Sequence, residues 1–186
     1  MFEVEVKFRL RDREEAERVR EYLERIDAKL LEDVVEEDLY FSHPCRDFSK
    51  TDEALRVRAL RRGTLEEIFL TYKGPRLGSE AKTRREATVQ VDNRDVLLEI
   101  LESLGFRPVA RVRKRRLVYT KENYTITLDE VDGLGYFVEI EVVTDSEDLA
   151  DRCVRDILNF ASTLGLGEDR IERRTYLEML LEKTIS

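Results

Sequence analysis

The sequence contains a single histidine and only two cysteines in 186 residues, so it is poor in the side chains that most often act as nucleophiles, acid–base catalysts or zinc ligands. Cys45 and Cys153 lie far apart, and neither belongs to a Cys-x-x-Cys motif, which argues against a disulfide framework and a structural zinc site. His43 stands beside Pro44, and we expect it in a loop rather than in a catalytic pair. Hydrolysis by a Ser-His-Asp or Cys-His arrangement is therefore not expected.

Long apolar runs are also missing. No segment approaches the roughly 20 apolar residues that a membrane-spanning helix needs, and the first ten residues, MFEVEVKFRL, place charges where a signal peptide has its apolar core. We therefore predict a cytoplasmic protein with no membrane partner. The net charge of −8 argues against a nucleic-acid polymer as partner. No P-loop and no Gly-x-Gly-x-x-Gly motif is present, so any nucleotide is held by other means.

Amide residues are scarce beside abundant charge. One glutamine and three asparagines accompany 33 basic and 41 acidic residues, a balance typical of proteins from organisms that grow at high temperature. We therefore predict a thermophilic source.

Hydrophobic periodicity predicts an alternation of strands and helices. Alternating apolar and polar residues predict strands at residues 2–10, 30–41, 54–62, 66–73, 83–91, 108–119, 124–128 and 135–143. Helical spacing and capping residues predict helices at 12–26, 93–104, 146–163 and 174–183. Asp12, Asn93 and Ser146 are the expected N-caps.

The two middle helices carry apolar stripes. Residues 93–104 place Val96, Leu97, Ile100, Leu101 and Leu104 on one face and end at Gly105. Residues 146–163 place Leu149, Cys153, Ile157 and Phe160 on one face and end at the sequence Gly-Leu-Gly. We expect these stripes to pack against a sheet.

The fold class that follows is α+β: a single domain over residues 1–186, with residues 145–186 as a helical C-terminal part and about eight mainly antiparallel strands. Two uses remain open for the charged strand faces. They can point to water, as in an ordinary half-exposed sheet, or line the interior of a closed barrel whose apolar faces are covered by helices.

Residues of both signs share the faces that would line such an interior. The acidic members are Glu3, Glu5, Glu86, Asp129, Glu139 and Glu141; the basic members are Lys7, Arg56, Arg58, Lys73, Arg84, Lys114 and Arg116. A polyphosphate needs Arg and Lys as donors, and carboxylates hold the Mg²⁺ or Mn²⁺ that bridges its oxygens. In VRKRR at 112–116, alternation sends Lys114 and Arg116 to one face and the neighbouring arginines to the other.

Five stretches in order resemble the CYTH family of triphosphate tunnel metalloenzymes, in particular its class IV adenylyl cyclase-like branch. They are Glu3-x-Glu5-x-Lys7, HPCRDFSKTDEALRVR at 43–58, TYKGP at 71–75, Val-x-Lys-x-Arg at 112–116, and LDEVDGLGYFVEIE at 128–141. The resemblance implies an eight-stranded, closed β-tunnel covered by amphipathic helices, and it favours lined interior faces over solvated ones. It also implies a homodimer.

The resemblance also implies roles for the charged residues. Glu3, Glu5, Asp129, Glu139 and Glu141 become the expected metal ligands for Mg²⁺ or Mn²⁺. The expected phosphate clamp is Lys7, Arg56, Arg58, Lys73, Lys114 and Arg116, with Arg84 and Glu86 on the same faces. Among these, Lys73, Lys114 and Arg116 are the expected catalytic residues, because they would stabilise charge on the phosphoryl oxygens.

The activity implied is that of an adenylyl cyclase, in which metal-assisted deprotonation of the ribose 3′-hydroxyl lets it attack the α-phosphate of ATP, giving cyclic AMP and pyrophosphate. Two alternatives stay open: an organic or inorganic triphosphatase that directs water at the terminal phosphorus, and a sensor that binds a triphosphate without turnover.

Overall fold

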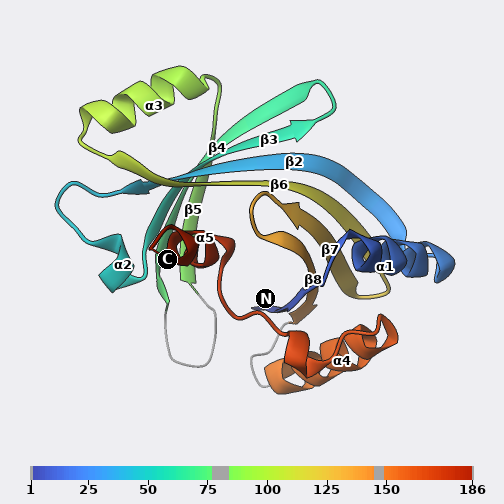
Figure 1. The fold of residues 1–186 in the computed structure, drawn as a ribbon. Coiled ribbons are helices and arrows are strands. Elements are labelled where there is room, and N and C mark those ends of the chain that lie inside the picture. The colour runs from blue at the N-terminus through green and yellow to red at the C-terminus, as the bar shows by residue number, and fades with distance from the viewer. Residues whose placement is uncertain (1, 77–83, 145–148, 186) are drawn as a thin grey trace. The chain divides into compact units, whose positions relative to one another are not determined.

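The computed structural model describes residues 2–76, 84–144 and 149–185, and its ribbon is drawn in Figure 1. The chain forms two compact units. The first contains residues 1–34 and 114–179, and the second contains residues 35–113 and 180–186. Strands β2 (Lys29–Ser42) and β6 (Arg107–Lys121) continue from one unit into the other.

The remaining elements follow the predicted order closely. The other strands are β1 (Phe2–Arg9), β3 (Ala54–Arg62), β4 (Leu65–Arg76), β5 (Arg84–Val91), β7 (Tyr124–Val131) and β8 (Gly135–Thr144). The helices are α1 (Arg13–Arg25), α2 (Phe48–Thr51), α3 (Arg94–Ser103), α4 (Ala150–Thr163) and α5 (Tyr176–Ile185), with a short 3₁₀ helix at Glu168–Arg170. The helix α2 was not predicted; it is one turn long, and the side chain of Asp47 caps it.

The strands form one sheet in the order β1-β8-β7-β6-β2-β3-β4-β5. The ladders are antiparallel between β1 and β8, β8 and β7, β7 and β6, β2 and β3, β3 and β4, and β4 and β5. This confirms the predicted α+β fold with an eight-stranded antiparallel sheet. Within the described residues, no ladder joins β1 to β5, so hydrogen bonds do not close the sheet. Neighbours such as β1 and β8 are far apart in sequence, and the local pattern alone does not pair them.

Side-chain capping explains where two helices begin. The side chain of Asp12 accepts a hydrogen bond of 2.8 Å from the backbone N–H of Glu15, and that of Asn93 accepts one of 3.1 Å from Val96. Both predicted N-caps are therefore confirmed, because each side chain satisfies a donor that the first helical turn leaves unpaired. The third, Ser146, lies outside the described residues.

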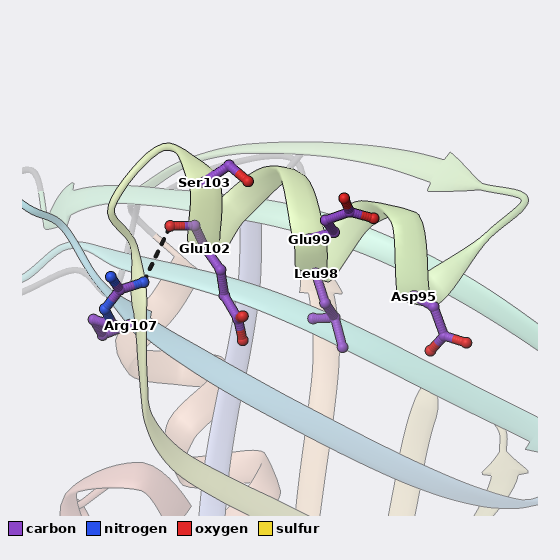
Figure 2. Close-up of a pocket in the computed structure, with 6 residues that line it drawn as sticks. All are labelled: Asp95, Leu98, Glu99, Glu102, Ser103 and Arg107. Atoms are coloured by element: carbon purple, nitrogen blue, oxygen red, sulfur yellow. Dashed lines mark hydrogen bonds between the residues drawn. The ribbon is translucent and has the colours of Figure 1, made fainter.

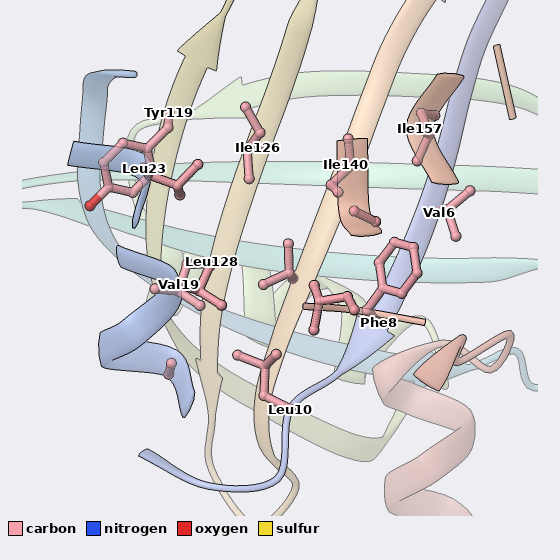
Figure 3. Packing of buried hydrophobic residues seen from close by; sticks show 14 of the residues in the cluster. Val6, Phe8, Leu10, Val19, Leu23, Tyr119, Ile126, Leu128, Ile140 and Ile157 are labelled. Atoms are coloured by element: carbon pink, nitrogen blue, oxygen red, sulfur yellow. The ribbon is translucent and has the colours of Figure 1, made fainter. Parts of the chain in front are cut away.

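The apolar faces of β1, β6, β7 and β8 form the core of the first unit, together with α1 and α4 (Figure 3). Its buried members are Val6, Phe8, Leu10, Ala16, Val19, Leu23, Tyr119, Ile126, Leu128, Val138, Ile140, Val142, Ile157, Ala161 and Leu166. Of the predicted α4 stripe, Ile157 is fully buried, Cys153 and Phe160 pack partly buried against the core, and Leu149 is exposed. Period-two alternation thus separates this core from a charged face on the same strands.

The core of the second unit is smaller and corrects one prediction. Its buried members are Phe41, Leu55, Val57, Ala59, Ile68, Leu97 and Leu101. Only Leu97 and Leu101 of the predicted α3 stripe are buried, whereas Val96, Ile100 and Leu104 are about half exposed or more. A helix that covers one face of a sheet buries only the narrow side directed at the strands. The prediction that all five apolar residues of α3 pack against the sheet was therefore wrong for three of them.

Both cysteines are free thiols, as expected. Among the helices of the described residues, none has the length and apolar character to cross a bilayer.

Truncation of the first core should be costly. Ile140→Ala removes a fully buried side chain and should lower the free energy of unfolding by about 2–5 kcal/mol through lost burial and a residual cavity. The control is Val143→Ala on the same strand, where the side chain is 45% exposed. Urea unfolding measures both, and equal losses in the two variants would contradict the assigned core.

Candidate functional site

The first unit carries a face of charged residues opposite its apolar core. We call it the unit-1 charged face, and its members are Glu3, Glu5 and Lys7 on β1, Lys114 and Arg116 on β6, Asp129 on β7, and Glu139 and Glu141 on β8. The ladder register places Lys7 opposite Glu139, Glu5 opposite Glu141, and Arg116 opposite Asp129. The pairing of β1 with β8 therefore brings together sequence positions more than 120 residues apart.

Arg116 is held by two carboxylates. Its Nε donates to Oδ1 of Asp129 at 2.7 Å, and its Nη2 donates to Oδ2 at 2.5 Å. The same Nη2 donates to Oε2 of Glu139 at 2.6 Å, and Oε1 of Glu139 lies 3.5 Å from the Nζ atom of Lys7. Asp129 is fully buried, and Lys7 is only 8% exposed. The bidentate geometry fixes the guanidinium plane, which a lysine at position 116 could not do.

Two acids of this face have opposite pKa shifts. Burial of the Glu139 carboxyl raises its pKa, but the charges of Arg116 and Lys7 lower it by more, so the pKa lies below the ordinary value. The pKa of Glu141 is raised, first by burial and then by the negative charges of Glu3 and Glu5. The face thus has a mixed region around Arg116 and an acidic region around Glu141.

The acidic region has the chemistry of a divalent-cation site. Glu5 and Glu141 are opposed across β1 and β8, and their repulsion is part of the reason the pKa of Glu141 is raised. A bound Mg²⁺ or Mn²⁺ would relieve that repulsion, and carboxylate oxygens are the ligands such ions prefer. In the part of the chain that the structure describes, however, no three acidic, histidine or cysteine side chains converge closely enough to hold a metal ion. The donor chemistry fits, and the side chains would have to draw together around the ion.

The second unit carries a separate charged face. We call it the unit-2 charged face, and its members are Glu36 and Asp38 on β2, Arg56 and Arg58 on β3, Lys73 on β4 and Glu86 on β5. Arg58 donates to both oxygens of Asp38 at 2.6 Å each, and its Nη1 lies 3.0 Å from Oε2 of Glu36. Asp38 and Glu36 are only 2% and 5% exposed. These two acids are the partners that allow the predicted arginines to lie in the protein interior.

Arg56 has an unsatisfied donor in this buried environment. Its Nη1 lies 3.6 Å from Oδ2 of Asp38, while its buried Nε has no hydrogen-bond partner among the described residues. Buried donors are rarely left unpaired, because desolvating them costs free energy. A phosphate oxygen is the kind of acceptor that would satisfy this donor.

Lys73 is less enclosed. Its Nζ donates to Oε1 of Glu86 at 2.7 Å, and both side chains are partly exposed. Lys73 and Glu86 are opposed in the ladder between β4 and β5. The predicted face shared by these residues is thus present. Arg84 is the first residue of β5, and its side chain lies outside the described part of the structure.

The exposure of side chains along β6 also agrees with the alternation predicted from the sequence. The side chain of Arg115 is 58% exposed and forms a bidentate pair with Asp33, at 3.0 and 2.7 Å. Lys114, its neighbour, is only 5% exposed. Alternation along this strand therefore divides a basic run between a buried and a solvated face, as predicted.

Three residues of these faces escaped the sequence analysis. Glu36 and Asp38 lie in an acid-rich strand, Glu36-Glu37-Asp38, whose pattern does not show which members turn inward. Tyr176 begins α5, and its hydroxyl donates to Oδ2 of Asp129 at 2.8 Å. Only the contacts of Tyr176 with other residues of the first unit reveal its place on the unit-1 charged face.

A surface groove in the second unit contains none of the predicted site residues (Figure 2). It has a volume of about 500 Å³ and is lined by Asp95, Leu98, Glu99, Glu102, Ser103 and Arg107. Arg107 donates from Nη1 to the backbone carbonyl of Glu102 at 3.1 Å. Three acids beside one arginine disfavour a phosphate ligand, so this groove is not the candidate site.

Comparison with known proteins gives consistent relatives. The CYTH domain family matches residues 1–176. A candidate adenylate cyclase from Methanocaldococcus jannaschii is 35% identical over 179 residues, which cover 96% of this chain and 98% of that protein. A solved structure from Pyrococcus horikoshii is 44% identical with a TM-score of 0.82 and covers 98% of this chain and 99% of its own. A candidate adenylyl cyclase from Hippeastrum, described as having a dominant triphosphatase activity, is 19% identical with a TM-score of 0.70 and covers 98% and 96%; this likeness shows the fold alone.

Breaking the buried pair of the second unit should be strongly destabilising. Asp38→Asn leaves Arg58 without its bidentate partner and should cost about 3–5 kcal/mol of unfolding free energy. The matched control is Asp33→Asn, which breaks the exposed bidentate pair with Arg115 and should cost at most about 1 kcal/mol. Denaturant unfolding measures both; similar costs would show that Asp38 is not buried as described.

Stability should also depend on pH through Glu172. Its oxygens accept from the side chain of Arg174 at 2.8 and 2.7 Å, which is the main reason its pKa falls from 4.5 to about 2. The interactions of the ionised Glu172 carboxylate therefore stabilise the folded state fully above pH 4.5, and this contribution is lost as the pH falls through about 2.

We therefore expect Glu172→Gln to be less stable than wild type at neutral pH, and we expect this difference to shrink as the pH falls from 4.5 through about 2, the folded-state pKa. Unfolding free energies measured across this pH range provide the test, with Glu21→Gln on the exposed side of α1 as control. A difference between wild type and Glu172→Gln that does not change with pH would contradict the assigned ion pair.

Proposed function

Because the chain belongs to the CYTH domain family, we propose that it is a metal-dependent enzyme acting on triphosphates, and that its reaction converts ATP to cyclic AMP and pyrophosphate. The observation that carries the proposal is the unit-1 charged face, where Lys7, Lys114 and Arg116 are buried or nearly buried beside acids on the same sheet face. Burying so many charges is costly in a face with only a structural role. A polyanionic ligand with its cation accounts for both signs.

The basic side chains bind and neutralise the phosphates. Arg116 is oriented by Asp129, so its donors are presented in one plane without reorganisation when charge develops on phosphoryl oxygens. Lys7 and Lys114 add two compact positive charges. For the second unit, taken by itself, we also propose phosphate binding by Arg56, Arg58 and Lys73, as predicted from the sequence. The buried Nε of Arg56, which has no hydrogen-bond partner among the described residues, supports this role.

The glutamates of this face would hold the metal. Glu3, Glu5 and Glu141 of the acidic region would supply carboxylates. Glu139 keeps the metal-binding role expected for it, although its oxygens also contact Arg116 and Lys7. Asp129, in contrast, is fully buried, and its oxygens accept three hydrogen bonds, from Arg116 and Tyr176. We therefore assign Asp129 the positioning of Arg116 rather than the metal-binding role expected from the sequence. When bound, Mg²⁺ or Mn²⁺ would supply Lewis-acid chemistry: it would neutralise phosphate charge and lower the pKa of a hydroxyl group.

In the cyclase reaction, the ribose 3′-oxygen bonds to the α-phosphorus, the bond from this phosphorus to pyrophosphate breaks, and the hydroxyl proton is released. The histidine is not available as its base. Nδ1 of His43 accepts hydrogen bonds from the backbone N–H groups of Cys45 and Arg46, both at 3.0 Å. Stabilisation of the leaving pyrophosphate by Lys114 and Arg116 is the contribution that this chain makes directly.

One observation favours a second function, that of a triphosphatase. The Hippeastrum protein has the same fold and a dominant triphosphatase activity, so the fold accommodates water as the nucleophile. Both reactions use the same phosphate-binding groups. They differ in the attacked phosphorus and in the nucleophile.

Product-resolved chromatography decides between them. The purified chain is incubated with ATP, thiamine triphosphate or tripolyphosphate, each with Mg²⁺ or Mn²⁺, at moderate and high temperature. Cyclic AMP with pyrophosphate supports the cyclase, and orthophosphate without cyclic nucleotide supports the triphosphatase. Binding of a triphosphate with no product under any condition would leave only a sensor.

Replacement of the oriented guanidinium should impair turnover. Arg116→Lys keeps the charge but loses the bidentate geometry, and we expect kcat/KM to fall by roughly 100-fold. Arg115→Lys is the matched control, because Arg115 is the next residue and forms a bidentate pair on the exposed side. Circular dichroism verifies that both variants are folded. Equal kcat/KM values for the two variants would remove Arg116 from the site.

A further inference from the structure

Tyr176 lies on the unit-1 charged face although it belongs to the helical C-terminal part of the chain. It is 7% exposed. The centre of its ring lies 4.4 Å from Nζ of Lys7 and 5.2 Å from Nζ of Lys114. One aromatic ring therefore contacts two ammonium groups that β1 and β6 supply separately.

The hydroxyl group of Tyr176 makes a second link. It donates to Oδ2 of Asp129 at 2.8 Å, the same oxygen that accepts from Nη2 of Arg116. Asp129 is fully buried, so water does not replace a lost partner at low cost. Tyr176 and Arg116 thus share one carboxylate, and the position of each depends on the other.

The segment that leads into Tyr176 is joined to β1. The backbone N–H of Glu172 donates to the carbonyl of Lys7 at 2.8 Å, and Nζ of Lys7 donates to the carbonyl of Arg174 at 3.1 Å. Ile171 forms an isolated bridge with Phe8. Lys7 is therefore held by its neighbours through both its backbone and its side chain, which fixes where Tyr176 enters the face.

The ring interactions suit a positioning role. A cation over an aromatic face is attracted by the ring quadrupole, most strongly where water is excluded. The ring also packs edge-on against Phe137, with centroids 5.0 Å apart. The ring is thereby held by one aromatic contact and by the two lysines.

We propose that Tyr176 is a positioning residue for triphosphate binding, which holds Lys7, Lys114 and the Asp129–Arg116 pair in the arrangement that receives phosphate oxygens. This inference rests on the function proposed above. It makes residues 171–176 part of the site, although they lie beyond the last β-strand. Tyr176 itself touches the phosphate-binding groups rather than the reacting atoms.

Two substitutions separate the hydroxyl from the ring. Tyr176→Phe removes only the hydrogen bond to Asp129, and we expect kcat/KM for ATP or tripolyphosphate to fall roughly tenfold, mostly through KM. Tyr176→Leu also removes the ring, and the loss should be larger, roughly 100-fold. The matched control is Tyr136→Phe, whose hydroxyl donates to the exposed side chain of Glu130 at 3.0 Å; its kcat/KM should stay at the wild-type value.

Nuclear magnetic resonance gives a readout that a general loss of stability would not produce. The ε-methylene protons of Lys7 and Lys114 should be shifted by the ring current in wild type and in Tyr176→Phe, and should lose that shift in Tyr176→Leu. Tripolyphosphate added without metal should perturb the same signals, with weaker binding in both variants. If Tyr176→Leu does not fold, Tyr176→Phe alone decides.

The outcomes are distinct. The proposal is overturned if Tyr176→Phe and Tyr176→Leu both keep the wild-type kcat/KM and the wild-type affinity for tripolyphosphate. It is also overturned if either quantity increases, because an increase would show that Tyr176 obstructs the lysines. If the wild type turns over no triphosphate, the proposed function fails, while weaker tripolyphosphate binding by Tyr176→Phe still supports the positioning role. If the wild type also binds no tripolyphosphate, both proposals fall.

Discussion

The requirement to pair buried charges organises both units of this protein. In each unit, an arginine on one strand lies directly opposite an aspartate on the neighbouring antiparallel strand, Arg116 opposite Asp129 and Arg58 opposite Asp38. Both pairs are bidentate, and both aspartates are almost completely buried. An isolated charge in such a position would cost several kcal/mol, on the order that makes it bind a proton or leave the interior. The antiparallel register is therefore tied to these ion pairs, since a slip by one residue would separate the partners and turn every side chain to the opposite face.

The same constraint divides the unit-1 charged face into regions of different chemistry. Around Arg116, three cations (Lys7, Lys114 and Arg116) outnumber two acids (Asp129 and Glu139), and the pKa of Glu139 is lowered. Around Glu141, carboxylates face one another, and its pKa is raised. A triphosphate with a divalent cation has the complementary distribution, because its oxygens need donors and its metal needs carboxylates. This division, rather than any single residue, supports the proposed binding of a triphosphate with its cation, and the lone histidine is engaged by its own loop.

The C-terminal segment does more than cover the strands, because it also contacts the unit-1 charged face. Residues 171–174 reach the charged face through contacts with Lys7, and Tyr176, which follows them, contacts two lysines and a buried aspartate. Apolar packing holds α4 on the opposite side of the same strands. Two helices with similar sequence patterns thus contribute differently: α4 completes the core, and the first residue of α5, Tyr176, completes the unit-1 charged face.

The sequence by itself determined the elements and the faces. Alternation identified the strands and showed that Lys114 and Arg116 point away from Arg115, because successive side chains in a strand alternate regardless of what lies around them. Capping residues located the starts of α1 and α3 for an equally local reason. Only the tertiary structure decided which strands are neighbours, which acids accept hydrogen bonds from the arginines, how narrow the buried stripe of α3 is, and that Tyr176 contacts the unit-1 charged face. These features depend on contacts between residues far apart in the chain, such as Tyr176 and Asp129, and a local pattern carries no information about the partner that packing will bring to a side chain.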